Sequence, residues 1–275
     1  MLNITKRLII LSIFSACMVS KPLLAQTDLA DQMASLKWIR APNTVQITDK
    51  ANLKITGNQL YLDSIETNKF LKMNGNLPRN NSYTLLEGKE FWFAVFDFTG
   101  EGYVKDNEKI NADELLKALK EGNVKSLEER KKQGLAPLYL DGWYIPPRYD
   151  TETKRLEWAT KLRDENNNPL INFTTRILGR SGYMSVTLVS SPENLDRDIK
   201  SFKTALKNFD YVNGERYSEW RDGDKVAAYG LGALVVGGAA AAVASKGGFK
   251  FLWAILLAAF VGIGAFLKRI FTKKQ

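Results

Sequence analysis

Histidine is absent from the 275 residues of this chain, and cysteine occurs once, at Cys17. Without histidine the chain has no Ser-His-Asp triad and no imidazole general base. Cys17 lies within residues 1–25, which have the features of a cleavable signal, so a cleaved chain has no thiol either. This excludes thiol nucleophiles, disulfides and the usual Cys/His zinc sites. An enzyme built on this chain would depend on carboxylates, lysine, tyrosine or a hard metal ion held by oxygen atoms.

The chain also lacks a charge excess where a nucleic-acid surface would need one. The formal net charge is +9, but residues 26–222 contain 29 basic and 29 acidic residues. A neutral domain has no electrostatic footprint for phosphate groups, which argues against a nucleic-acid partner. The excess positive charge lies in the two terminal segments, where it can meet anionic lipid.

The beginning of the chain has the pattern of an export signal. Lys6 and Arg7 precede an apolar run over residues 8–19, and a small-residue exit follows at 23–25. This charged, apolar, cleavable order is typical of a secretory signal. The run that ends at Cys17 also resembles a lipoprotein cleavage box. Cys17 is therefore either an ordinary apolar signal residue or the lipidated first residue of the mature chain.

The end of the chain is apolar over residues 226–267. As helices, residues 226–244 would span about 28 Å and residues 251–267 about 26 Å, which is enough to cross a bilayer. Because both stretches are long enough, a two-helix hairpin is the expected arrangement, and small residues that recur every four positions would let its helices pack closely: Ala233, Gly237, Ala241, Ala254, Ala258 and Gly262. The alternative, which the positive charges after residue 267 favour, is a single pass through the second stretch with the end of the chain in the cytoplasm.

The sequence thus divides into a signal (1–25), an exported domain (26–222) and a membrane anchor (223–275). Apolar periodicity and capping residues in the middle segment predict strands and helices in mixed order. The expected strands are 44–56 (with a turn), 59–62, 90–98, 138–145, 155–163, 169–178 and 183–189. The expected helices are 27–38, 64–75, 111–119, 124–134 and 191–208.

Residues 155–163 give the clearest strand signal. Apolar and charged side chains alternate along them with a period of two, as in a half-buried antiparallel strand. Pro146 and Pro147 are expected to end the strand before it. Consecutive strands joined by short turns, then a helix, predict an α+β fold: an antiparallel sheet with covering helices, followed by C-terminal transmembrane helices.

Residues 97–108 have the outline of a calcium loop. Asp97 stands at its first position, a glycine at the sixth and Glu108 at the twelfth. Thr99 and Glu101 would be the other side-chain ligands. An aromatic strand precedes the motif where a helix is expected, and a glycine-rich turn explains the same residues. The sequence therefore predicts no metal and no cofactor.

A second group of residues could form a recognition surface. Residues 142–150 concentrate aromatic side chains, two prolines and an arginine, and proline-fixed aromatic ledges bind peptides or glycans at low entropic cost. Arg176 and Arg180 flank a glycine turn and could bind an anionic group. The alternative is that these residues have only structural roles. The aromatic side chains would then lie in the core, the prolines would end a strand, and the arginines would be solvated charges at the edge of the sheet. The candidate interaction surface comprises Trp143, Tyr144, Pro146, Pro147, Arg148, Tyr149, Arg176 and Arg180.

Three ordered motifs resemble a bacterial family. They are Gly142-Trp143 with Pro146-Pro147, Tyr149-Asp150 and Trp158-Ala159; residues 175–180 with 182–186; and residues 223–230. The chain is similar over residues 27–271 to a family known only as predicted membrane-anchored proteins, domain of unknown function 2167. The resemblance implies an envelope protein anchored at its C-terminus, and it supplies no activity or catalytic residues.

These observations predict a protein of the bacterial cytoplasmic (inner) membrane whose soluble domain lies on the periplasmic side. Its expected partners are the lipid bilayer and another envelope protein or a second copy of itself. The missing residue types favour a non-enzymatic binding or scaffolding module. Two alternatives stay open: a carboxylate-dependent cell-envelope hydrolase, and an oligomeric structural membrane module.

Overall fold

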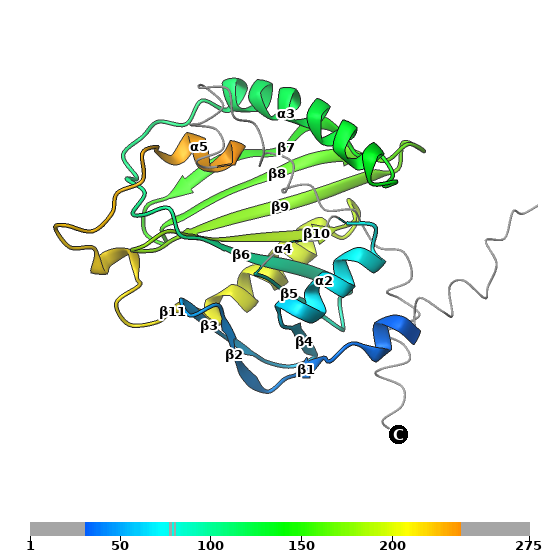
Figure 1. Ribbon diagram of the computed structural model, residues 1–275, viewed down its shortest axis with the longest axis horizontal. Helices are drawn as coiled ribbons and strands as arrows, with labels where there is room; N and C mark the ends of the chain where they lie inside the picture. Colours follow the sequence, from blue (N-terminus) through cyan, green and yellow to red (C-terminus); the bar gives the residue numbers. More distant parts are fainter. Residues whose placement is uncertain (1–30, 77–78, 80, 238–275) are drawn as a thin grey trace, which may run out of the picture.

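A computed structural model describes residues 31–76, 79 and 81–237 (Figure 1). An eight-stranded sheet forms its centre, and each neighbouring pair of strands is antiparallel. The expected α+β fold with an antiparallel sheet is confirmed. In sheet order the strands are β1 (Ile39–Arg40), β4 (Gln59–Leu62), β5 (Ser82–Glu87), β6 (Trp92–Thr99), β10 (Tyr183–Ser190), β9 (Pro169–Leu178), β8 (Arg155–Arg163) and β7 (Tyr139–Asp150).

A smaller sheet packs below the large one. It contains β11 (Phe209–Tyr211), β3 (Ala51–Ile55) and β2 (Asn43–Ile47), in that order. The strand-turn-strand predicted over 44–56 is confirmed, because β2 and β3 pair antiparallel. Their buried and exposed residues alternate, so the apolar side chains of β3 all face the main core.

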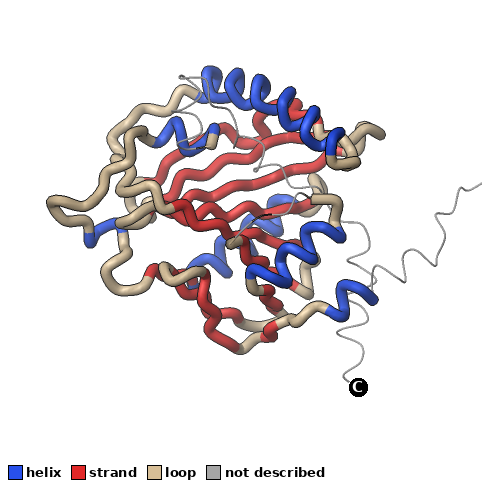
Figure 2. Tube along the Cα trace, viewed as in Figure 1, coloured by secondary structure: helices blue, strands red, loops and turns tan. Residues whose placement is uncertain are grey.

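Two layers cover the faces of the large sheet (Figures 1 and 2). On one face lie α2 (Ser64–Met73), α3 (Ala112–Lys132) and the short α5 (Leu231–Val236), whose apolar residues share clusters with Phe93 and Trp158. On the other face lie α4 (Leu195–Ala205) and the small sheet. Phe202 of α4 makes edge-to-face contacts with Trp92 and Phe173, with ring centroids 5.9 and 6.0 Å apart.

The two helices predicted over 111–119 and 124–134 are one helix, α3. Asn111 caps its start, with its side chain accepting the Glu114 N–H at 3.4 Å. The Gly122-Asn123 pair, which separated the two predicted helices, is buried inside it. The Asn123 side chain donates to Leu138 O at 2.9 Å and accepts the Leu140 N–H at 3.0 Å. A polar residue that looks like a helix break is therefore the link between α3 and β7.

The expectation that Pro146 and Pro147 end the strand is wrong. β7 continues through them to Asp150, with register shifts against β8 on the way. The reason is position: β7 is the last strand of the sheet, and an edge strand tolerates residues that have no N–H to donate. The helix expected over 191–208 begins later, as α4 at Leu195, and ends in the 3-10 turn η1 (Leu206–Asn208).

The beginning of the apolar tail belongs to the folded domain. The helix expected over 226–244 does not begin at Val226, because Tyr103 and Val226 form a parallel bridge there. Helix α5 ends before Gly237, whose φ is 116°. Of the small-residue positions, Ala233 lies within α5 and Gly237 just past its end. The second tail stretch (251–267), the remaining small residues and the signal (1–25) lie outside the described residues. No helix of the described part is long and apolar enough to cross a membrane.

Candidate functional site

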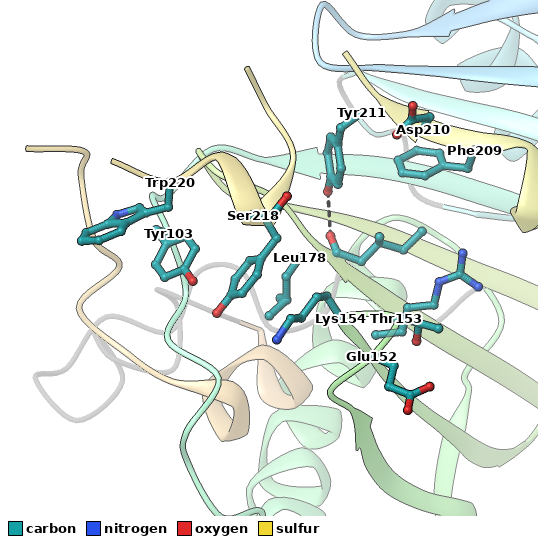
Figure 3. A pocket seen from close by; sticks show the side chains of 13 residues that line it. Tyr103, Glu152, Thr153, Lys154, Leu178, Phe209, Asp210, Tyr211, Ser218 and Trp220 are labelled. Carbon is teal, nitrogen blue, oxygen red and sulfur yellow. Dashed lines mark hydrogen bonds between the residues drawn. The ribbon is translucent and has the colours of Figure 1, made fainter. Parts of the chain in front are cut away.

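A cleft of about 590 Å³ opens at the end of the large sheet, beside the turn between β7 and β8 (Figure 3). Five separate parts of the chain line it: Tyr103, residues 152–155, the end of β9, strand β11, and residues 217–220 around the 3-10 turn η2 (Tyr217–Glu219). Trp220 and Tyr103 lie at one end of the cleft, and Glu152 and Thr153 lie at the other.

Three aromatic side chains, Tyr103, Tyr217 and Trp220, form the aromatic row of the cleft. The Tyr103 ring stacks on Tyr217 with centroids 4.4 Å apart and contacts Trp220 at 5.4 Å. The Tyr217 hydroxyl donates to Val104 O at 3.0 Å, and the Tyr103 N–H donates to Lys225 O at 2.8 Å. Trp220 is 38% exposed. The row is thus held by backbone carbonyls and presents its outer ring to solvent.

Lys154 lies along the row and has its charge balanced inside the protein. Its Nζ donates to Asp106 Oδ2 at 2.8 Å and lies 5.1 Å from the centre of the Tyr217 ring. The Tyr149 hydroxyl donates to the same carboxylate oxygen at 2.8 Å. Burial raises the pKa of Asp106, but the hydrogen bonds from Lys154 and Tyr149 outweigh it and hold that pKa below its usual value.

Arg155 is the second cation of the cleft, and it forms no direct ion pair with the described residues; the carboxylates of Glu157 and Asp150 stabilise its charge only from a longer distance. Its Nη2 donates to Leu206 O at 3.2 Å. Its Nε is buried and has no hydrogen-bond partner. Within the described part of the chain, no carboxylate lies within ion-pair distance of Arg155, whereas Asp210 across the cleft is bound by Arg216 at 2.6 Å. Burial lowers the pKa of the Arg155 guanidinium, as expected for a cation drawn away from water.

The structure divides the predicted interaction surface on β7 between the two sides of the strand. Trp143 points inward, donating its indole N–H to Ala112 O at 3.0 Å. Pro147 is buried, whereas Tyr144, Pro146 and Arg148 are exposed. Arg148 lines a second cavity, of about 260 Å³, which β7 shares with β8, β9 and α4.

The two arginines of the predicted surface lie apart from these residues. Arg180 forms a two-pronged ion pair with Asp224, with Nε–Oδ2 and Nη2–Oδ1 distances of 2.6 and 2.7 Å. This guanidinium lowers the pKa of Asp224 from its ordinary 3.8 to about 2. Arg176 is not a solvated edge charge: it is 5% exposed and lies between the rings of Trp158 and Tyr183, at 5.6 and 5.0 Å from their centres.

The side chains of the calcium-loop outline each have partners elsewhere in the protein, and the outline begins within a strand. Strand β6 runs through Asp97 and Thr99, and Asp97 is bound by Arg79 at 3.1 Å. Glu101 accepts the Tyr229 hydroxyl. Glu108 accepts the Gly232 N–H at 3.0 Å. Within the residues that the structure describes, no group of three acidic, histidine or cysteine side chains could hold a metal ion.

The sequence did not single out the residues of the cleft. Tyr103, Lys154, Arg155, Tyr217 and Trp220 come from segments up to about a hundred positions apart, so no local spacing connects them. The one available signal was Trp220, a large aromatic residue within the charged segment 215–225.

Comparison with known proteins gives the family of the chain but no activity. A cyanobacterial PsbP (CyanoP) from Synechocystis sp., known from a solution structure, is similar with a TM-score of 0.35 and 10% identity, covering 62% of this chain and 92% of that one. No curated protein matches. The family model described as "Protein of unknown function (DUF2167)" matches residues 39–268. The chain belongs to the DUF2167 family.

Proposed function

We propose that this protein is a non-enzymatic binding module of the bacterial envelope, and that its ligand occupies the cleft beside the aromatic row. The volume of about 590 Å³ supports this, because it falls in the range of small-ligand sites. The proposed module is anchored by its C-terminal tail in the cytoplasmic membrane, with its domain on the periplasmic side.

The way the aromatic row is held is the main support for binding. Backbone carbonyls fix Tyr103 and Tyr217, so the rings keep their place without a ligand. A surface that is already ordered loses little conformational entropy when it binds. Aromatic side chains also give large contact areas at binding sites. The row is therefore suited to hold an apolar or ring-shaped part of a ligand.

The charges of the cleft favour binding over the hydrolase alternative. A hydrolase of the carboxylate type needs two free carboxyl groups across its cleft. The carboxylates that line this cleft are Glu152 and Asp210, and Asp210 accepts two hydrogen bonds from Arg216 at 3.1 and 2.6 Å. Burial raises the pKa of the Glu87 carboxyl, but Glu87 lines neither of the two cavities.

A crosslinking experiment tests the proposal. A photo-reactive benzoylphenylalanine replaces Ser218, which is exposed at the cleft, and in a matched strain it replaces Val124, which is 58% exposed on α3. We expect a defined adduct in living cells from position 218 and not from position 124. The adduct should be lost when Trp220→Ala is added. Equal adducts at both positions, or none at 218, would contradict the proposal.

A further inference from the structure

We propose that the ligand of the cleft carries a carboxylate group, that Arg155 binds this carboxylate, and that the adjoining part of the ligand stacks on the aromatic row. This inference depends on the proposed function, because it names the ligand chemistry of the same cleft. It is carried by the geometry and the charges of the residues that line the cleft.

The first step concerns the position of Arg155. It is the first residue of β8, and its backbone pairs with Asp150 on one side and Ile177 on the other. The bond from Nη2 to Leu206 O fixes one corner of the guanidinium. Arg155 lines the cleft, and its Nε is buried inside the protein without a partner. A guanidinium has five N–H donors, and the bond to Leu206 O uses one of them, so acceptors that a ligand brings to the nitrogens on the cleft side are stabilising.

The second step concerns charge. Lys154 is neutralised by Asp106, and Asp210 by Arg216, so neither pair needs a charge from outside. Arg155 forms no ion pair with any described residue. Glu157 and Asp150 stabilise its charge only from beyond ion-pair distance, so a negative group of a ligand would form its first direct ion pair. A phosphate dianion fits less well, because it would bring two charges to one free cation and face the carboxylates of Glu152 and Asp210.

The third step concerns shape. The nitrogens of a guanidinium lie in one plane and match the two oxygens of a carboxylate, which is also planar. The aromatic row leads away from the polar end of the cleft toward solvent (Figure 3). The expected ligand thus has a carboxylate next to a ring or an apolar face. The C-terminus of a peptide and an acidic sugar both offer this chemistry.

The test uses the full chain in detergent micelles and calorimetric titration with four probes. N-acetyl-tyrosine and glucuronic acid carry the carboxylate, and N-acetyl-tyrosine amide and methyl glucoside are their neutral counterparts. We expect at least one acid to bind about tenfold or more tightly than its neutral counterpart. Preference for N-acetyl-tyrosine identifies a peptide terminus as the source, and preference for glucuronic acid identifies an acidic sugar.

Variants assign the preference to Arg155. Arg155→Gln should remove the preference for the acid, and Arg155→Lys should keep part of it, because lysine retains the charge without the planar fork. Arg40→Gln removes an exposed arginine of β1, away from the cleft, and should bind as the native chain does. The melting curve of each variant shows whether it is folded.

Two results overturn the inference: both acids bind no better than their neutral counterparts, or a folded Arg155→Gln variant keeps the preference. Neither result contradicts the proposed function if the crosslink from position 218 still forms. Loss of that crosslink, by contrast, removes the ligand site itself.

Discussion

At the scale of single residues, buried arginines are the unusual feature of this domain. Arg130 and Arg176 are 3% and 5% exposed, and neither forms an ion pair with any described residue. Arg130 donates to two carbonyls, Ala136 O at 2.6 Å and Gly75 O at 3.2 Å, near the ends of α3 and α2. Arg176 has two aromatic faces instead, and its Nε has no partner. The two residues therefore represent a satisfied and an unsatisfied buried cation.

This difference predicts opposite responses to the same substitution. Arg176→Met should leave the free energy of unfolding within about 1 kcal/mol of the native value or raise it, because a buried charge is often replaced by an apolar side chain at no cost. The two cation–π contacts are worth about 2 kcal/mol each at a desolvated site, and the cost of burying an unpaired guanidinium, several kcal/mol, offsets them. Urea unfolding, followed by circular dichroism, measures both proteins.

Arg130→Met is the matched control for Arg176→Met. It should lower the free energy of unfolding by about 2 kcal/mol, because it leaves the carbonyls of Ala136 and Gly75 without their donor. A loss of about 3 kcal/mol or more for Arg176→Met would show that the protein compensates the Arg176 charge after all.

The Arg180–Asp224 ion pair predicts a defined pH dependence. The pKa of Asp224 is lowered from 3.8 to about 2, so the folded state favours the ionised carboxylate. Stability from this group is fully present above the unfolded pKa and is lost as the pH falls through the folded one. Asp224→Asn should therefore lower the melting temperature at pH 7. The difference from the native chain should shrink below about pH 4 and close near pH 2.

A neighbouring carboxylate serves as the control for this measurement. Asp222 is exposed in the same segment, and Asp222→Asn should change the melting temperature little at any pH in this range. A pH-independent difference for Asp224→Asn would mean that its effect comes from packing and not from ionisation.

At the scale of elements, Gly102 joins three segments. Its N–H donates to Ser181 O at 3.0 Å, and the next residue, Tyr103, pairs with the 225–227 segment. Its φ is +106°, and a Cβ there would lie 2.6 Å from Lys225 O. Gly102→Ala should cost about 3 kcal/mol of unfolding free energy, from backbone strain and a steric clash together. It should also weaken ligand binding, because Tyr103 starts the aromatic row.

Gly57→Ala is the control that separates the cost of backbone strain at a positive φ from the cost of a steric clash of the added Cβ. Gly57 also has a positive φ, of +62°, but nothing lies within 4 Å of its added Cβ. This substitution should cost about 1 kcal/mol and leave binding unchanged. Thermal unfolding and the calorimetric titration compare the two variants, and equal losses would contradict the steric role of Lys225 O.

Elements with a strong period were predictable from the sequence, and the exceptions have physical reasons. The sequence predicts strand β8 at its observed bounds because its side chains alternate toward two different environments. It predicts two helices in place of α3 because Gly122 and Asn123 have low helix propensity, which burial against β7 overrides. It predicts too early an end for β7, because sheet order, and not local sequence, decides which strand lies at an edge.

The cleft shows the limit of the same approach. Its lining comes from five segments that only the sheet topology brings together. Composition excludes imidazole chemistry, because the chain has no histidine. It could not show that Arg155 lines a cleft without a direct ion pair, because that depends on which carboxylates other cations bind. The residues of the predicted surface on β7 also lie apart from one another, on two sides of the strand, and this too depends on the tertiary structure.

At the scale of the whole molecule, the docking of α5 changes the expected membrane topology. Leu231, Leu234 and Val235 are buried against the large sheet and α3, so this part of the tail belongs to the domain. If α5 stays docked, the first apolar stretch has only residues 238–244 left, which is far short of the roughly 20 residues needed to span a bilayer. Residues 251–267 are long enough. Docking thus favours the single pass, in agreement with the charges after residue 267.

Single cysteines test this topology with a membrane-impermeant maleimide on cells whose outer membrane is permeabilised, in a Cys17→Ser background. Val124→Cys should be labelled if the domain is exported, because position 124 is 58% exposed. Ser245→Cys should also be labelled, and Thr272→Cys only after the cells are lysed. Labelling at 272 but not at 245 would mean that the two-helix hairpin forms and that α5 leaves the sheet to enter the membrane. No labelling at 124 would place the domain in the cytoplasm and end the case for an envelope ligand, whatever the cleft binds in solution.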